Sequence, residues 1–435
     1  MWAYERIFYQ IYPLGMTGAP FANDGILTHR ILKVKEWIPH LQKLGIGAVY
    51  FSPLFESDTH GYNTRDYRRI DTRLGTNADF WEVCEALHEA NIRIILDGVF
   101  NHAGRGFFAF LDVLKNRENS PYRDWFFIDF NGNSRYNDGL WYEGWEGCYD
   151  LVKLNLRNEE VVRYLLESVR FWIDQFGIDG LRLDVAYMLD EDFLRRLRRE
   201  TGQIKEDFFL LGEILGGDYN RIMNDQMCHS ATNYECYKGL YSSFNSMNLF
   251  EIVHSLQRQF GPESWTLYRG RHPVSFADNH DVTRLASNLT NAQHLPLLYT
   301  LLYGMPGIPM LYYGSEWGVR GHKNDGDPAL RPAIDEPLEN ALTDHLARLG
   351  QIWTGSKALQ YGEYRTEVLT NRQCVFRRFT EQENVYIVIN ADEQPYTARF
   401  DTGTKNFTDL ITGNPVSAAD GMQLAPYQSM ILQPA

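Results

Sequence analysis

Buried strands that end in polar residues recur along this chain, and they constrain its fold more than any other feature. In each, an apolar run typical of a buried strand is followed by polar residues at or just past its C-terminal end. Four segments have this design: IILDGVFNH (94–102), GLRLDVA (180–186), LLGEI (210–214) and SFADNHD (275–281). A (β/α)8 barrel gathers such strand ends at one face. We therefore expect Asp184, Glu213 and Asp281 to lie together, although they are far apart in the sequence.

Strand-like runs alternate with amphipathic helical stretches over most of the chain, which is the pattern of a parallel sheet covered by helices. Eight runs are predicted to be barrel strands: 7–12, 47–52, 93–100, 177–184, 208–214, 230–236, 273–278 and 308–314. The 3.6-residue apolar period predicts four of the helices, at 159–176, 243–259, 292–304 and 337–352. The predicted fold class is α/β, with a (β/α)8 TIM barrel.

Two segments depart from this alternation. Residues 103–150 contain no clear helix and are rich in Gly, Asn, Asp and Trp, and a long irregular insertion of this kind is usually functional or disordered. Residues 355–435 contain short alternating runs separated by polar turns, which predict a small antiparallel β-domain. The sequence is thus divided into a barrel (1–102 and 151–354), an insert and a C-terminal domain.

The composition excludes several classes of protein. A formal charge of −14 argues against a nucleic-acid partner, which needs clustered Lys and Arg. No run approaches the roughly 18 apolar residues of a transmembrane helix, and charges interrupt the N-terminal apolar run, unlike in a signal peptide. The five cysteines form no CxxC pair, so neither a disulfide framework nor a zinc site is predicted. We expect a cytoplasmic protein without membrane partners.

Arg182 and Asp184 are two residues apart and therefore lie on the same face of a strand. An arginine beside a carboxylate lowers its pKa by ~1–3 units, so Asp184 is expected to stay ionised, as the nucleophile of a glycosidase must. Taken alone, these two residues fit a structural ion pair at the rim of the barrel equally well.

Glu213 follows Gly212 at the end of an apolar strand. Burial raises the pKa of a carboxyl, so Glu213 is expected to stay protonated near neutral pH and to act as a general acid. A glutamate that caps a following helix would have the same position. The opposite environments predicted for Asp184 and Glu213 favour the catalytic interpretation.

His102 and His280 follow two of the predicted strands. A single histidine at a strand end is more often structural than catalytic. Two histidines beside three carboxyls at the same edge of a sheet are harder to explain by packing, because buried charges without a role are costly.

These segments resemble, in order and approximate spacing, the characteristic regions of the α-amylase family, glycoside hydrolase family 13. KLN (153–155) resembles a fifth region found in the neopullulanase and cyclomaltodextrinase group, and GLRLDVA resembles the second region of that group. The resemblance covers essentially the whole chain. It implies an inserted B domain after the third strand (103–150) and a C-terminal antiparallel β-sandwich (355–435).

The same resemblance implies a role for each site residue. Asp184 matches the nucleophile, Glu213 the acid/base, and Asp281 the carboxylate that stabilises the oxocarbenium-like state. Six further residues match positions that contact the sugar at the cleavage site: Tyr62, His102, Arg182, His280, Asp327 and Arg331.

The expected activity is retaining hydrolysis of α-1,4-glucosidic bonds in short linear or cyclic malto-oligosaccharides, with the oligosaccharide as the binding partner. Alternatives are glucosyl transfer or isomerisation on the same triad, α-1,6 hydrolysis, and a catalytically silent homologue, against which the intact triad argues. Trp141, Tyr142 and Trp145 either wall the sugar site or form the core of the insert.

No cofactor is predicted. Many calcium-dependent members of the family have Lys-His where this chain has Tyr187 and Met188, and the loss of that histidine removes support for the shared calcium site, although Asn101 is present. The oligomeric state is left open.

Overall fold

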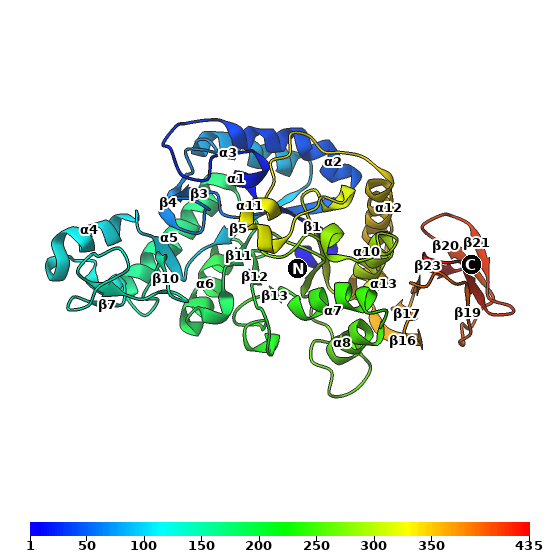
Figure 1. Cartoon of the computed structure of the whole chain (residues 1–435). Coiled ribbons are helices and arrows are strands. Elements are labelled where there is room, and N and C mark those ends of the chain that lie inside the picture. Colours follow the sequence, from blue (N-terminus) through cyan, green and yellow to red (C-terminus); the bar gives the residue numbers. More distant parts are fainter.

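Eight parallel strands form the centre of the molecule (Figure 1), as seen in a computed structural model that describes residues 1–435. They are β1 (Ile7–Ile11), β2 (Ile46–Phe51), β5 (Arg93–Gly98), β11 (Gly180–Leu183), β12 (Phe209–Gly212), β13 (Ser230–Ala231), β14 (Val274–Phe276) and β15 (Ile308–Tyr312). Their order is β13-β12-β11-β5-β2-β1-β15-β14, and a parallel bridge from Thr232 to Val274 joins the two edges. The sheet therefore closes, and the predicted (β/α)8 barrel is confirmed.

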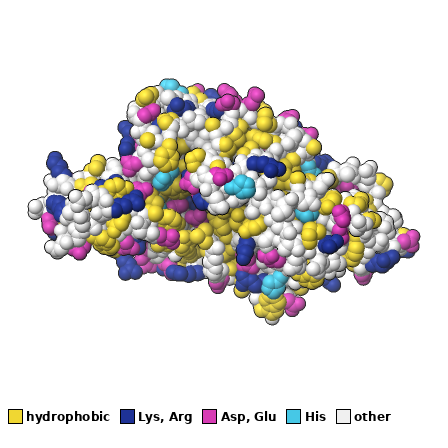
Figure 2. Space-filling view, viewed as in Figure 1, with side chains coloured by type: hydrophobic (Ala, Val, Ile, Leu, Met, Phe, Trp, Pro, Cys, Tyr) yellow, Lys and Arg dark blue, Asp and Glu magenta, His cyan; other side chains and the backbone are white.

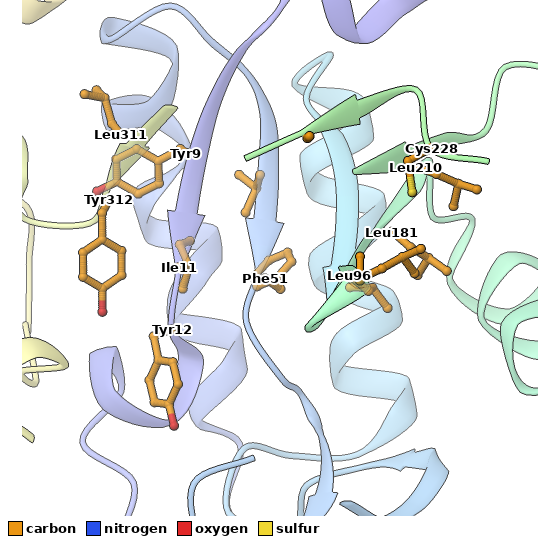
Figure 3. Close-up of a cluster of buried hydrophobic side chains, with 14 of the residues drawn as sticks. Tyr9, Ile11, Tyr12, Phe51, Leu96, Leu181, Leu210, Cys228, Leu311 and Tyr312 are labelled. Carbon is orange, nitrogen blue, oxygen red and sulfur yellow. The ribbon is translucent and has the colours of Figure 1, made fainter. Parts of the chain in front are cut away.

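Alternate residues of a strand point to opposite faces, and both faces of the barrel strands are buried. One set faces the surrounding helices, and Figure 3 shows members of it: Tyr9, Ile11, Phe51, Leu96, Leu181 and Leu210. The alternate set, with Phe8, Tyr50, Ile95, Leu211 and Phe276, belongs to a separate core of 11 buried residues. This second core fills the barrel.

Helices follow most of the barrel strands: α2 (Ile38–Lys43), α3 (Asn77–Glu89), α5 (Glu159–Phe176), α6 (Glu191–Ile204), α7 (Tyr234–Asn245), α8 (Phe250–Phe260), α10 (His294–Gly304) and α12 (Ala341–Gly355). The side chain of Asn158 caps the first turn of α5 by accepting from the N–H groups of Glu160 and Val161. Gly177 ends the same helix at a φ of 66°, a conformation that glycine adopts without strain.

Two predicted elements differ from the structure. The segment 230–236 is a strand only over β13, because Asn233 caps α7 and accepts from the N–H of Cys236. The single helix predicted at 243–259 is instead the end of α7 followed by α8. Met247 lies between them at a φ of 51°, a left-handed conformation that interrupts the helix.

The insert after β5 contains a helix that the sequence did not predict, α4 (Phe108–Asn116), whose buried side chains are Ala109, Phe110 and Val113. Around it are short strands: β6 (His102–Gly104), β7 (Ile128–Asp129), β8 (Trp141–Tyr142), β9 (Gly144–Trp145) and β10 (Cys148–Lys153). The antiparallel pairing of β6 with β10 holds the two ends of the insert together beside the barrel. The insert extends to one side of the barrel in Figure 1.

The C-terminal part is antiparallel. Six strands form one sheet: β16 (Glu363–Leu369), β17 (Gln373–Phe379), β18 (Asn384–Asn390), β23 (Gln428–Pro434), β20 (Asn406–Asp409) and β21 (Pro415–Ser417). A two-stranded sheet, β19 (Tyr396–Ala398) and β22 (Met422–Leu424), packs on it through a core of 9 buried residues. No helix of the chain is both long and apolar enough to span a bilayer.

Candidate active site

The inward-facing residues at the C-terminal ends of β5, β11 and β12 are polar. Arg182 on β11 is in register with Asp97 on β5 and with Leu211 on β12. Asp184 and Glu213 lie two residues beyond Arg182 and Leu211, and so on the same face. The alternation that places apolar side chains inside the barrel therefore also places these charged groups at its rim.

One guanidinium joins three carboxyls at this rim. Arg182 Nη1 lies 2.9 Å from Asp97 Oδ1 and 2.8 Å from Asp184 Oδ1, and its Nη2 lies 2.7 Å from Glu213 Oε1. All four side chains are buried. Tyr50 donates to Asp97 Oδ2 at 2.8 Å, which fixes the carboxyl behind Arg182. The sequence predicted the pair of Arg182 with Asp184 but not this shared arrangement.

The electrostatics of Asp184 differ from the prediction. Burial raises its pKa well above the ordinary value, Arg182 opposes this, and the Glu213 carboxyl adds to the rise. The predicted lowering of the pKa is wrong because one guanidinium is divided among three buried carboxyls. Burial also raises the pKa of Glu213, as the sequence predicted, although Arg182 and the Val185 N–H, 2.8 Å from Oε2, oppose it.

Asp281 faces this group across the barrel mouth and has a different environment. Its Oδ1 lies 3.1 Å from Arg331 Nη2, and its Oδ2 lies 3.0 Å from His280 Nε2. Although burial raises its pKa, His280 and Arg331 together bring the pKa below its ordinary value. Arg331 also contacts Asp327 Oδ2, at 3.0 Å. Asp281 is therefore held ionised.

The two predicted histidines are buried, and burial lowers the pKa of each to about 3. Gln10 donates to His280 Nδ1 at 2.7 Å, so the proton of His280 is on Nε2, toward Asp281. The Tyr62 ring stacks on His280, with centroids 5.7 Å apart. His102 Nε2 lies 4.0 Å from Asp184 Oδ2 and has no hydrogen-bond partner, so it is free to donate to a ligand.

A cleft of about 460 Å³ opens above these groups. Seven of the nine predicted site residues line it: Tyr62, His102, Asp184, Glu213, Asp281, Asp327 and Arg331. Arg182 and His280 lie beneath, where they contact the carboxyls. Residues that sequence reasoning did not assign to the cleft also line it, among them His60, Leu151, Leu215, Tyr234, Val282 and Lys323. Figure 2 shows a hollow on this face with acidic side chains inside it.

Comparison with known proteins agrees with this geometry. A model of the α-amylase catalytic domain matches residues 31–373, which is most of the chain. The chain belongs to the α-amylase family. As a member of this family, it is an α-glucan glycosidase.

This α-amylase family member is 32% identical to neopullulanase 2 of Thermoactinomyces vulgaris, over 99% of its own chain and 78% of that protein. It is also 32% identical to a cyclomaltodextrinase of a Bacillus species, over 92% of its own chain and 75% of that protein. Its structure is similar to that of a cyclic α-maltosyl-(1→6)-maltose hydrolase from Arthrobacter globiformis. The TM-score is 0.85 at 26% identity, and 99% of each chain is covered.

The aromatic residues of the insert have different positions in this family member. Trp145 lines the cleft, with its ring 6.3 Å from that of His102 and its Nε1 without a partner. Tyr142 is fully buried and packs edge-on against Phe110, with centroids 4.8 Å apart, in the core of the insert. Trp141 is 40% exposed and lies outside the cleft lining. Only Trp145 of the three can therefore contact a ligand in the cleft.

The surroundings of Asn101 do not fit the calcium site that many members of the α-amylase family carry. Asn101 shares a cavity with Lys153 and Met188, and its side-chain amide faces His102 Nδ1 at 3.1 Å. Calcium needs six to eight oxygen ligands, whereas Met188 offers a soft thioether and Lys153 a positive charge. The carboxylates that line the same cavity are already engaged, since Asp190 caps α6 and Glu191 and Asp192 pair with Arg195. Nowhere in the chain do three or more His, Cys, Asp or Glu side chains form a metal-binding group.

Chelation is therefore expected to leave the activity of this α-amylase family member unchanged. The measurement is the rate on maltotriose before and after dialysis against EDTA. A loss of activity that calcium restores would contradict this expectation and would place an oxygen-rich site elsewhere, with the 131–138 segment of the insert as the first place to search.

Proposed function

We propose that this protein is a retaining glycosidase that cleaves α-1,4-glucosidic bonds in short linear or cyclic malto-oligosaccharides. The observation that carries the proposal is the Arg182 guanidinium, which holds Asp184 and Glu213 together at the floor of one cleft. A retaining mechanism needs its two carboxyls about 5–5.5 Å apart, and an inverting one about 6.5–9.5 Å. Two carboxyls that accept from the two terminal nitrogens of a single guanidinium favour the shorter separation.

In the first step, the Asp184 carboxylate attacks the anomeric carbon while Glu213 gives its proton to the glycosidic oxygen. The bond to the leaving sugar breaks, and a glycosyl ester to Asp184 forms. Burial raises the pKa of Glu213 and of Asp184 alike. The reaction uses the state in which the pair holds one proton, on Glu213, and Asp184 is charged beside Arg182. Asp281, held ionised beside Arg331, stabilises the positive charge that develops on the sugar ring.

In the second step, Glu213 takes a proton from water, and the oxygen of that water attacks the anomeric carbon. The ester to Asp184 breaks, and its carboxylate is regenerated. Each step inverts the anomeric centre, so the product keeps the configuration of the substrate. Arg182 contacts Asp184 and balances its negative charge before the first step and again after the second, when the carboxylate has been regenerated. The Nε2 proton of His102, which lacks a partner, is available to a sugar hydroxyl near Asp184.

The dimensions of the cleft support a small substrate. Its volume of about 460 Å³ is within the range of small-ligand pockets, and Trp145 and Leu151 of the insert form part of its wall. The similar Arthrobacter protein is named as a hydrolase of a cyclic maltosyl-maltose, and the Bacillus relative as a cyclomaltodextrinase. The cytoplasmic location stays a prediction.

The rate per enzyme on maltotriose or a cyclodextrin is expected to exceed that on soluble starch by about tenfold, which corresponds to ~1.4 kcal/mol of barrier. Chromatography of the products with time on maltotriose, panose, a cyclodextrin, pullulan and starch measures this. Equal rates on starch, with long random products, would contradict the proposed substrate class. Cleavage of panose at its α-1,6 bond would show α-1,6 hydrolysis in place of α-1,4 hydrolysis. Products longer than the substrate would show glucosyl transfer in place of hydrolysis.

A further inference from the structure

A second cavity, of about 210 Å³, lies at the end of the barrel opposite the cleft. Residues 269–272 and 306–307, which precede β14 and β15, form one wall. Residues 360–364 and Arg378, from α13 (Lys357–Tyr361), β16 and β17, form the other. The cavity therefore lies at the junction of the barrel with the C-terminal sheet, and none of its residues takes part in the proposed reaction.

The charge of this cavity is opposite to that of the whole chain. The protein carries a formal charge of −14, yet Arg269, Arg271 and Arg378 line the cavity and Glu363 is the one carboxyl among the lining residues. Arg269 donates only to backbone oxygens, those of Gly261 and Glu263. Arg271 forms one exposed ion pair, with Asp225. The arginines of this cavity are therefore mostly not neutralised by the protein itself.

Arg378 is the most unusual of these side chains, because it is 1% exposed and forms no ion pair. It donates to the carbonyl oxygens of Gly304 and Gly362, each at 3.0 Å. A buried charge without a counter-charge is strongly unfavourable, and burial lowers the pKa of Arg378 to about 9. An anion in the cavity would remove this penalty.

His272 supplies a second, independent indication of a ligand. It lines the cavity, is nine-tenths buried, and its Nδ1 has no hydrogen-bond partner. Its ring is fixed by stacking on Tyr4, with centroids 4.1 Å apart. Because buried polar atoms are normally paired, an unpaired nitrogen in the lining of a basic cavity indicates a hydrogen-bonding ligand.

We propose that this cavity binds a phosphate group, either as inorganic phosphate or as the monoester of a small sugar. Guanidinium groups bind phosphate oxygens through paired, charge-assisted hydrogen bonds. The neutral His272 ring adds a further donor in the tautomer that has its proton on Nδ1. The volume, less than half that of the cleft, suits a ligand of this size rather than an oligosaccharide. A bound phosphate would join the barrel to the C-terminal sheet and stabilise their contact.

The direct test is calorimetric titration of the whole chain, together with thermal unfolding, using inorganic phosphate and glucose 6-phosphate as probes. Sodium chloride at equal ionic strength is the control. We expect saturable binding and a rise in Tm above that in chloride, because a ligand that binds only the folded state stabilises it. Equal binding of the two probes would show that the site recognises the phosphate group alone. Tighter binding of glucose 6-phosphate would show that the site recognises the monoester of a sugar. Absence of binding by both probes would overturn the proposal.

Variants locate the binding. Arg378→Gln and Arg269→Gln are each expected to weaken phosphate binding about tenfold or more, because each removes a charge-assisted hydrogen bond. Arg399→Gln, at an exposed position outside the cavity, should bind as the wild type does. Circular dichroism checks the fold, and exposed Arg269 carries the test if the Arg378 variant does not fold. Wild-type affinity in Arg269→Gln, or in a folded Arg378→Gln, would contradict the assignment to this cavity.

Discussion

Replacing Asp184 with asparagine is expected to lower kcat on maltotriose by ~10⁴-fold or more, because an amide cannot form the glycosyl ester. The fold should persist, since asparagine has the shape of aspartate and Arg182 keeps its contacts with Asp97 and Glu213. Steady-state kinetics together with a thermal melt measures both quantities. An Asp184→Asn enzyme with the kcat of the wild type would contradict the role of Asp184 as nucleophile.

Asp179→Asn is a matched control, because Asp179 is also buried and lies just before the opposite end of the same strand. It forms ion pairs with Arg93, Lys205 and His88 at 2.6, 2.7 and 2.9 Å. Its loss should lower the stability but leave kcat unchanged at temperatures where the variant is folded. Side chains at this end of a (β/α)8 barrel contribute to stability, whereas those at the other end contribute to catalysis.

Replacing Arg182 with methionine is expected to lower the free energy of unfolding by about 3–5 kcal/mol, because it leaves three buried carboxyls without their shared counter-charge. Arg182→Lys should recover only part of this loss, since one ammonium cannot reach all three carboxyls with the geometry of a guanidinium. Denaturant unfolding monitored by circular dichroism gives the values. An unchanged stability in Arg182→Met would show that the carboxyls do not depend on Arg182.

The stability that Arg182→Met loses should depend on pH, and the direction of this dependence can be derived. Without Arg182, the pKa values of the buried carboxyls rise further in the folded state, while in the unfolded state they stay near 4. The folded state then binds more protons than the unfolded state, so its stability falls as the pH rises above the unfolded values. The loss in Arg182→Met should therefore be smaller at pH 5 than at pH 8, and the reverse order would contradict the arrangement of charges described above.

The barrel could be predicted from the sequence because two signals agree. Apolar runs of strand length alternate with helices, and polar residues follow the runs at the same end each time. The strand 93–98 is apolar because it is buried on both faces, and the two-residue period of a strand places Asp97 on the inner face, beside Arg182. The sequence did not predict the element boundaries that are set by local capping, such as the start of α7 at Asn233. It also did not predict helix α4, because this helix lies within a polar insert.

The charge balance of the site could not be predicted in the same way. Spacing within one strand places Arg182 beside Asp184, but the contacts of Arg182 with Asp97 and Glu213 depend on the register of three strands. The sequence therefore indicated the residues of the cluster but gave the wrong direction for the pKa of Asp184. Similarly, nothing in the sequence distinguishes Trp145, which lines the cleft, from Tyr142, which is part of the core of the insert.

The most direct test of the proposed reaction is to trap its covalent intermediate. A fluorinated glucosyl fluoride reacts quickly in the first step, because fluoride leaves readily, and slowly in the second, because the ring fluorine destabilises the oxocarbenium-like state. Peptide mapping by mass spectrometry of the protein after reaction with this reagent then identifies the residue that carries the sugar. The proposal predicts one glucosyl group on the peptide that contains Asp184. A glucosyl group on any other residue, or an enzyme that turns the reagent over without forming an adduct and gives a product of inverted configuration, would contradict it.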